Sequence, residues 1–389
     1  MIDYSKIIPS TVSEMKPSGI RKFFDMIGSM QDVIALTVGQ PDFVTPWHIR
    51  EAAIESLEKG KTYYTSNSGT PELRHEISAY MKRRFALNYS EDKEIIVTVG
   101  GSEAIDLAVR AVVAPGEEVI IPQPSFVCYG PIVSLAGGVP VYVNTKEKNK
   151  FKITAEELEA AITPKTKMVV LPFPNNPTGA IMTAEDLEKI AEVLRDKDII
   201  VLSDEIYCEL TYGLNHVSIA SLPGMRERTI IASGFSKAYA MTGWRLGYTL
   251  APEEITRQML KIHQYALMCA PTASQFAAVE AMKNGDEDVE AMKKEYNRRR
   301  RYIVGGLHTI GIESFDPEGA FYVFPNISGY GMNSEEFCEK LIHENGVAIV
   351  PGTAFGDCGE GFARISYAYS VEHIAKALDR MEAFVKKHK

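Results

Sequence analysis

The sequence predicts an α/β protein in which a mostly parallel sheet lies between helices, followed by a smaller α+β domain. From Glu94 onward, short apolar runs alternate regularly with helical patterns, as expected for parallel strands joined by helices. After residue 286, a long charged helical pattern leads into shorter strands and helices. We expect an N-terminal arm and part of the small domain over 1–45, the large domain over 46–285 and the small domain over 286–389.

Apolar and helical patterns place the individual elements. Strands of the large sheet are predicted over 95–99, 118–121, 139–143, 167–171, 198–202, 229–232 and 248–251, and helices over 48–58, from 71, and over 103–113, 184–196 and 258–281. In the small domain we expect strands over 320–324, 347–350 and 363–366, and helices over 286–307, 334–345 and 371–387.

The charge balance argues against nucleic acid as a main partner. Net charge is −9, from 42 basic and 51 acidic residues, and no long block of one sign occurs. The Arg298–Arg301 cluster lies between acidic residues on a predicted helix, so we interpret it as a solvated face.

Cysteine usage and hydropathy indicate a soluble cytoplasmic protein. The five cysteines are scattered, odd in number and without a CxxC pair, which favours free thiols and argues against disulfides or a metal site. The first residues lack the pattern of a secretory signal, and no apolar run reaches the length of a membrane span. We therefore expect no membrane association.

The segment 229–248 carries the first chemical signal. Lys237 follows a short buried strand, where poor hydration would lower the pKa of its amine and make it nucleophilic. Arg245, eight residues later, is a cation suited to phosphate. This pair indicates a Schiff-base lysine beside a phosphate site, although two such cations on one solvated face are common.

Five residues of suitable chemistry each follow an apolar strand: Gly100, Phe126, Asn176, Asp204 and Lys237. Ligands of open, mostly parallel α/β sheets bind at the carboxyl ends of the strands, so these residues should meet at one edge. Taken singly, each also has a structural interpretation, such as a tight turn at Gly100 or core packing of Phe126.

Two charged side chains need partners of opposite charge or strong hydrogen bonds. Asp204 ends a buried strand, and its partner is either a structural cation or a protonated ring nitrogen. Arg364 lies in the last predicted strand, and its partner is either a structural carboxylate or a bound anion.

The turn Gly100-Gly101-Ser102 opens a helix, whose free N–H groups suit a phosphate.

The chain resembles the class I aminotransferases of fold type I, and within them the prokaryotic aspartate and aromatic branch. That resemblance implies a large domain with a mostly parallel seven-stranded sheet and a smaller α+β domain. The motifs that carry it are Gly39-Gln40-Pro41-Asp42-Phe43, Tyr64 with Gly69 and Pro71-Glu72-Leu73-Arg74, Gly100-Gly101-Ser102-Glu103-Ala104, Asn175-Asn176-Pro177-Thr178-Gly179, Ser203-Asp204-Glu205-Ile206-Tyr207, Ser236-Lys237, Thr242-Gly243-Trp244-Arg245 and Ala363-Arg364-Ile365-Ser366.

The resemblance implies pyridoxal 5′-phosphate as cofactor. Lys237 would bind it covalently and later move the substrate Cα proton, and Asp204 would keep the pyridine nitrogen protonated. Asn176 and Tyr207 would hydrogen-bond the phenolic oxygen of the ring, and Phe126 would stack on the ring. The catalytic residues are therefore expected to be Lys237, Asp204 and Tyr207.

Phosphate and substrate contacts follow from the same resemblance. The phosphate would be held by Gly100, Gly101, Ser102, Ser236 and Arg245 and by Tyr64 from a neighbouring subunit, which implies a homodimer. Arg364 would bind the substrate α-carboxylate, with help from the Gly39 backbone and Asn176, and Ile20 of the arm would line the side-chain pocket.

The predicted function is ping-pong transfer of an amino group from an L-amino acid, aromatic, aspartate or other, to a 2-oxo acid such as 2-oxoglutarate. A carbon–sulfur β-lyase on the same fold would use the same Lys237 and Asp204. A non-catalytic regulator is a further alternative, but the arm before Gly39 is too short for a winged-helix domain. Phe126 stands where many relatives have Trp, and no Arg is assigned to a distal substrate carboxylate.

Overall fold

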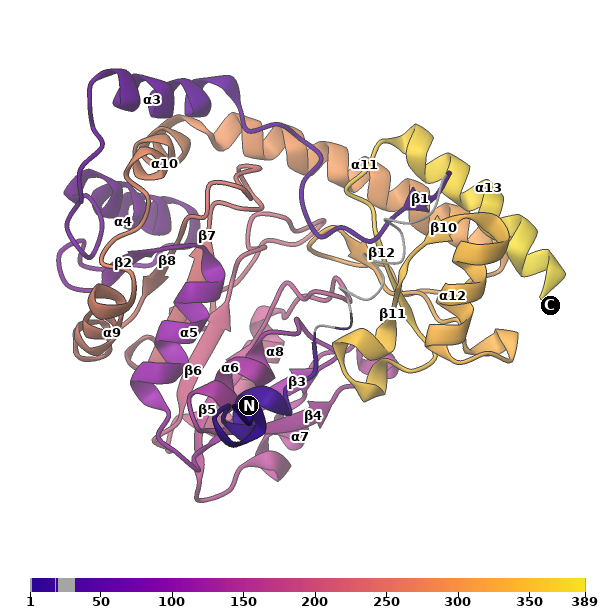
Figure 1. Cartoon of the computed structure of the whole chain (residues 1–389), viewed down its shortest axis with the longest axis horizontal. Coiled ribbons are helices and arrows are strands. Elements are labelled where there is room, and N and C mark those ends of the chain that lie inside the picture. Colours follow the sequence, from indigo (N-terminus) through magenta and orange to yellow (C-terminus); the bar gives the residue numbers. More distant parts are fainter. Residues whose placement is uncertain (1, 18, 20–31, 389) are drawn as a thin grey trace.

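A seven-stranded sheet forms the centre of the computed structural model, which describes residues 2–17, 19 and 32–388 (Figure 1). The strand order is β2-β8-β7-β6-β5-β3-β4, and β8 alone within this sheet runs against the others. All seven predicted strands are confirmed, as β2 (Ile95–Thr98), β3 (Glu118–Gln123), β4 (Val139–Asn144), β5 (Thr166–Leu171), β6 (Ile200–Asp204), β7 (Thr229–Gly234) and β8 (Gly247–Leu250).

Helices cover both faces of this sheet, so its central strands read as continuous apolar runs. Val170 packs on the face covered by α5 and α9, whereas its neighbour Val169 packs on the face covered by α7 and α8. The helices of this part are α3 (Trp47–Glu58), α4 (Pro71–Phe85), α5 (Gly101–Val112), α6 (Tyr129–Leu135), α7 (Ala155–Ala161), α8 (Ala184–Leu194), α9 (Glu253–Ala266) and α10 (Thr272–Asn284).

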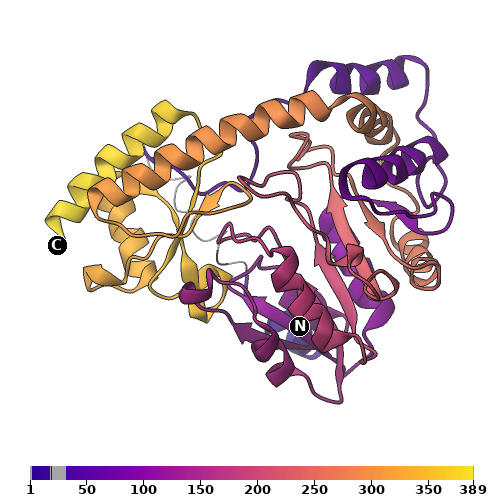
Figure 2. The same ribbon diagram turned by 180° about the vertical axis from the view of Figure 1, so that it is seen from behind.

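The C-terminal part is reached along the 25-residue helix α11 (Asp286–Ile310), which runs from the helices beside the large sheet into the C-terminal part in Figure 2. Its own core lies between α11, α13 and two small sheets, with strand orders β11-β12-β9 and β1-β10. The elements are β1 (Ile34–Ala35), β9 (Tyr322–Val323), α12 (Ser334–Asn345), β10 (Val347–Ala348), β11 (Val350–Pro351), β12 (Ala363–Ser366) and α13 (Val371–Lys387).

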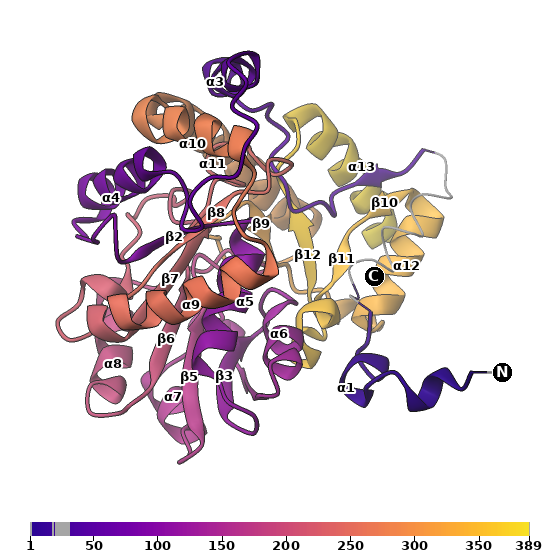
Figure 3. The same cartoon turned by 60° about the vertical axis from the view of Figure 1, so that its left-hand side comes forward.

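Because β1 pairs with β10, residues near the N-terminus join the C-terminal core. The domain bounds given above stay a prediction. Figure 3 shows the N-terminal segment with α1 (Ser10–Ser13) on the outside of the molecule. The other short elements are η1 (Tyr4–Lys6), η2 (Glu147–Asn149), η3 (Ile219–Ser221), η4 (Arg226–Arg228), η5 (Ser328–Tyr330), η6 (Gly352–Phe355) and η7 (Asp357–Gly359).

Two interpretations of the sequence are wrong. The single helix over 258–281 is two helices, because Pro271 cannot continue a helix and Met268 adopts a left-handed conformation, with φ of 70°. Arg299 is not on a solvated face: it is buried and pairs with Asp42 at 2.7 Å and Glu295 at 2.9 Å. The Asp42 pair ties the turn that follows Gln40 to α11.

No helix in the described part of the chain is long and apolar enough to cross a membrane.

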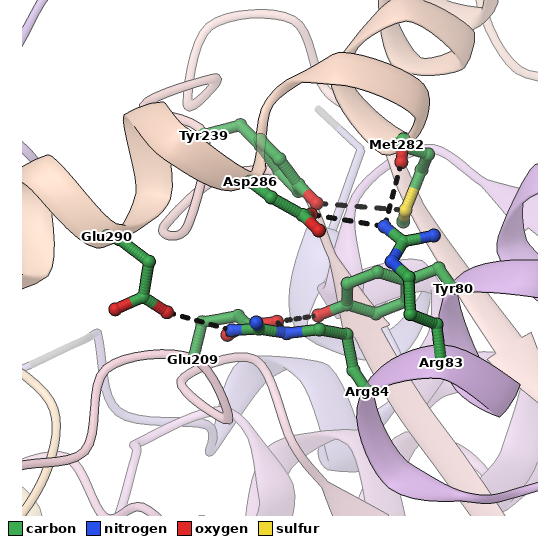
Figure 4. A network of polar contacts seen from close by, with 8 residues as sticks. All are labelled: Tyr80, Arg83, Arg84, Glu209, Tyr239, Met282, Asp286 and Glu290. Atoms are coloured by element: carbon green, nitrogen blue, oxygen red, sulfur yellow. Dashed lines mark hydrogen bonds and ion pairs between the residues drawn. The ribbon is translucent and has the colours of Figure 1, made fainter.

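A network of polar contacts fastens α4 to the start of α11 through a buried carboxylate (Figure 4). Glu209 accepts a hydrogen bond from the Tyr80 hydroxyl at 2.5 Å and from Arg84 Nε at 2.9 Å. Arg84 also pairs with Glu290 on α11 at 3.1 Å, and Arg83 pairs with Asp286 at 3.1 Å. Because Glu209 is buried, removing its charge leaves Arg84 and Tyr80 short of an acceptor.

Glu209→Gln should therefore lower the free energy of unfolding by about 2 kcal/mol, less than the roughly 3–5 kcal/mol for breaking a fully buried pair, because Arg84 is partly exposed and keeps Glu290. Urea unfolding followed by circular dichroism measures the change. Glu290→Gln, which alters the exposed partner, is the matched control and should change stability by at most about 0.5 kcal/mol. Equal losses of stability in the two variants would show that the buried Glu209 contributes no more than the exposed Glu290.

Candidate active site

A cavity of about 390 Å³ lies at the carboxyl-terminal edge of the large sheet, where the C-terminal part meets it. This is the edge at which ligands of such sheets bind, and the volume suits a small molecule. Its walls come from strand ends, from the segment 37–40 and from β9 and β12. The lining residues used below are Thr37, Gly39, Gly101, Ser102, Phe126, Tyr129, Asn176, Asp204, Tyr207, Ser236, Lys237, Arg245, Tyr322 and Arg364.

Lys237 lies three residues after β7 and extends into the cavity. Its Nζ donates to the Gly39 carbonyl oxygen at 2.5 Å. Burial lowers the pKa of the amine to about 8, and the positive charges of Arg364 and Arg245 act in the same direction. Because about a tenth of an amine with this pKa is neutral at pH 7, Lys237 is primed to attack a carbonyl carbon.

Asp204 is buried at the end of β6, beside the cavity. Its Oδ2 accepts from the Tyr129 hydroxyl at 2.7 Å and its Oδ1 from the Ile206 amide at 3.2 Å. Burial raises the pKa of the carboxyl, and these hydrogen bonds oppose the rise. Within the described residues no Lys or Arg forms an ion pair with Asp204, so the structural cation considered from the sequence is not there.

Arg364 is a buried cation without a carboxylate partner among the described residues, with a side chain that is 2% exposed. It donates to Asn176 Oδ1 at 3.0 Å and to the Thr37 carbonyl oxygen, while its Nε has no hydrogen-bond partner. The rings of Tyr322 and Phe355 flank the guanidinium at 4.6 and 4.8 Å. A buried, incompletely paired Arg that faces a cavity is a site for an anion.

A second anion-binding element lines the same cavity. The helix α5 begins at Gly101, so Gly101 and Ser102 present its positive end to the cavity. Gly100 has a φ of 78°, and an added Cβ would lie 2.5 Å from Nη2 of Arg245. A glycine is therefore needed where the turn and the guanidinium meet, and Arg245 keeps most of its hydrogen bonds free for a ligand.

The structure brings together most of the residues singled out from the sequence. Phe126, Asn176, Tyr207, Ser236 and Gly39 all line the same cavity as Lys237, Asp204 and Arg364. Tyr64 does not: it lies in the loop between α3 and α4 and is 78% exposed. Ile20 lies outside the described residues.

Three lining residues that hydrogen-bond the predicted site residues were missed from the sequence. Tyr129 donates to Asp204, Thr37 accepts from Arg364, and Tyr322 hydrogen-bonds the Tyr207 hydroxyl at 2.9 Å. Tyr129 had a detectable signal, because it lies just past the strand that precedes Phe126. Thr37 and Tyr322 come from segments that reach the cavity only through tertiary packing.

Among the described residues, no group of three or more His, Cys, Asp or Glu side chains could hold a metal ion. The charged groups of the cavity are instead an amine, a carboxylate and two guanidinium groups. Together with the helix N-terminus, they define an enzyme of amine chemistry on small anionic molecules.

Comparison with known proteins identifies the family. The profile of the family described as aminotransferase class I and II matches residues 31–381. The chain belongs to this family and is an aminotransferase. The resemblance to class I aminotransferases and the fold class inferred from the sequence are thereby confirmed. The prediction that the protein is an aminotransferase is confirmed as well.

Relatives with assigned names agree with this assignment. The chain is 57% identical to a putative aminotransferase, YugH, of Bacillus subtilis, over 97% of each chain. It is 46% identical to an aspartate aminotransferase of Pyrococcus abyssi, over 96% of this chain and 97% of the relative. The solved structure of an aromatic aminotransferase from Pyrococcus horikoshii superposes with a TM-score of 0.90 at 44% identity, covering 95% of this chain and 99% of the other.

Proposed function

We propose that this aminotransferase uses pyridoxal 5′-phosphate, bound covalently to Lys237, and exchanges an amino group between an L-amino acid and a 2-oxo acid. The observation that carries the proposal is the cavity itself, in which a lysine of lowered pKa faces a buried carboxylate between two cation sites. The two cation sites match the two anions of such a reaction, the cofactor phosphate and the substrate carboxylate.

The residues present fit the cofactor. The cradle of Gly100, Gly101 and Ser102 with Arg245 suits its phosphate, and Ser236 adds a hydroxyl beside them. Asp204, which forms no ion pair with any described residue, suits a protonated ring nitrogen. When bound, pyridoxal 5′-phosphate supplies an aldehyde that captures amines and a ring that withdraws electrons from the substrate Cα.

The protein's own groups supply positioning and proton transfer. Asp204, held by Tyr129, would keep a proton on the ring nitrogen, and Asn176 and Tyr207 would hydrogen-bond the phenolic oxygen. Phe126 would stack on the ring. The Lys237 amine would take the proton from the substrate Cα atom and donate it back to the cofactor side of the transfer.

Arg364 would bind the α-carboxylate that every amino-acid substrate shares. Its unpartnered Nε and its buried position suit a two-point hydrogen bond to a carboxylate. Gly39 lies beside it in the cavity wall, and Ile20 of the arm is proposed for the side-chain pocket. The relatives named for aspartate and for aromatic amino acids make these the first two substrate classes to test.

The exposed Tyr64 fits a homodimer in which this side chain reaches the phosphate of the neighbouring cavity. Sedimentation equilibrium tests the dimer. For a further test, a mixed dimer is made in which one chain carries Tyr64→Phe and the other carries Lys237→Ala. If Tyr64 reaches the neighbouring cavity, both substitutions fall in the cavity of the Lys237→Ala chain, and the other cavity keeps normal activity. Loss of activity in both cavities would contradict a shared site.

The direct test of the transfer reaction uses each half-reaction alone. Holoenzyme mixed with L-aspartate or L-phenylalanine, without a 2-oxo acid, should convert its cofactor to pyridoxamine phosphate and release one 2-oxo acid per site. Adding 2-oxoglutarate should restore the original spectrum. Continuous release of pyruvate and ammonia from L-cysteine conjugates, with no such conversion, would contradict the transfer.

Replacing Arg364 by Met should raise KM for every amino acid by about 10²-fold, because a charged two-point hydrogen bond is lost. Steady-state kinetics with L-aspartate, L-phenylalanine and L-alanine measure the effect. Arg300→Met is the control, since this Arg lies over the Tyr212 ring in the C-terminal part, outside the cavity. A loss confined to L-aspartate would show that Arg364 binds the distal carboxylate instead.

A further inference from the structure

Tyr322 contacts both Arg364, which is proposed to bind the substrate carboxylate, and Tyr207, which is proposed to face the cofactor. Tyr322 on β9 pairs with Ser366 on β12, and Arg364 is two residues from Ser366 on the same face of that strand. Tyr322 and Arg364 are therefore diagonal neighbours, with the guanidinium 4.6 Å from the ring centroid. At its other end, the Tyr322 hydroxyl lies 2.9 Å from that of Tyr207, which follows β6 in the large sheet.

The segment 37–40 leaves room for the Tyr322 hydroxyl at Gly39. An added Cβ at Gly39 would overlap the Tyr322 oxygen, so the glycine supplies space there. The same glycine accepts the hydrogen bond from Lys237 through its carbonyl oxygen. Tyr322 thus lies against the glycine that holds the reactive amine, against the anion-binding Arg and against the Tyr207 hydroxyl.

Packing alone does not require the hydroxyl of Tyr322. A phenylalanine would fill the same buried space, whereas a buried phenol must find a hydrogen-bond partner. Burial raises the pKa of both tyrosines, so both hydroxyls carry their protons at neutral pH. One must donate to the other. Burial and the nearby Asp204 raise the pKa of Tyr207 further. Arg364, in contrast, lies over the Tyr322 ring and lowers its pKa, so Tyr322 is the more acidic donor.

We propose that Tyr322 is a positioning residue that donates to Tyr207, directs the Tyr207 proton into the cavity and supports Arg364 with its ring. The inference rests on the proposed function, because it takes Tyr207 to face the phenolic oxygen of pyridoxal 5′-phosphate. A phenol that accepts one hydrogen bond is a stronger donor of the next. Tyr322 would therefore link the carboxylate site to the electronic state of the cofactor.

The first test is the pH midpoint of the visible absorbance of the holoenzyme. Tyr207→Phe should shift this midpoint, and Tyr322→Phe should shift it in the same direction by a smaller amount, up to about one pH unit. The double variant should match Tyr207→Phe alone, because both changes act through one hydroxyl. Gly39→Ala, which displaces the Tyr322 hydroxyl, should shift the midpoint as Tyr322→Phe does.

The second test needs no cofactor. Calorimetric titration of the apoenzyme with maleate and with 3-phenylpropionate reports the Arg364 site through unreactive carboxylates. Tyr322→Phe keeps the ring and should change these affinities by at most about threefold, whereas Tyr322→Leu removes the ring and should weaken them about tenfold. Equal effects of the two variants would overturn the part assigned to the ring.

Tyr367→Phe is the matched control, because this buried tyrosine of the same sheet region donates to the Ala320 carbonyl oxygen at 3.1 Å and does not line the cavity. It should leave both the midpoint and the carboxylate affinities unchanged. An unshifted midpoint in Tyr322→Phe, with a normal visible band in the parent enzyme, would overturn this inference alone. A parent enzyme without any visible band would overturn the proposed function and this inference together.

Discussion

Lys237→Ala should abolish transamination, with a loss of about 10⁴-fold or more, because the variant would lack both the amine proposed to capture the cofactor and the base proposed to move the Cα proton. Its visible absorbance band after incubation with pyridoxal 5′-phosphate should also disappear. Stopped-flow half-reactions and absorbance spectra measure the two effects.

Lys237→Arg is the matched variant, since it keeps the positive charge but cannot act as a nucleophile at neutral pH. It should be as inactive as the alanine variant. Activity near that of the parent enzyme in either variant would contradict the assignment of Lys237.

The lowered pKa of Lys237 gives this prediction a pH dependence. Only the neutral amine attacks an aldehyde, so capture of pyridoxal 5′-phosphate by the apoenzyme should accelerate with rising pH and level off above about 8. Arg364 is one of the charges that lower this pKa. In Arg364→Met the amine pKa should therefore rise and the rate should level off at a higher pH.

Asp204→Asn should slow the half-reaction by about 10³-fold, because an amide has nearly the same shape but cannot keep a proton on the ring nitrogen. Tyr129→Phe leaves the carboxylate in place and removes one hydrogen bond, so its effect should be about tenfold. Single-turnover rates with L-aspartate or L-phenylalanine measure both. An unchanged rate in Asp204→Asn would mean that the ring nitrogen needs no anionic partner.

The large sheet could be predicted from the sequence because most of its strands are buried on both faces, although the edge strand β4 is partly exposed. Each one is a short run of apolar residues such as Ile95–Thr98 or Ile200–Asp204, bounded by turn residues. The residues after those strands meet at one edge for a topological reason, which is why Asp204, Asn176 and Lys237 could be placed in one site without coordinates.

The rest of the site depends on packing that a sequence pattern does not encode. Tyr322 reaches Arg364 through the register of β9 and β12, and Tyr207 through the contact between the two parts of the chain. Arg299 belongs to a charged run, yet its pairing with Asp42 across the fold buries it. The break between α9 and α10 had a local signal in Pro271, which the helical periodicity on either side concealed.

The most direct test of the account is chemical. The enzyme is incubated with pyridoxal 5′-phosphate, reduced with borohydride, digested and analysed by mass spectrometry. We expect one reduced cofactor per chain, attached to the side chain of Lys237. A protein that gains no mass, or one modified at another lysine while Lys237 stays free, would contradict it.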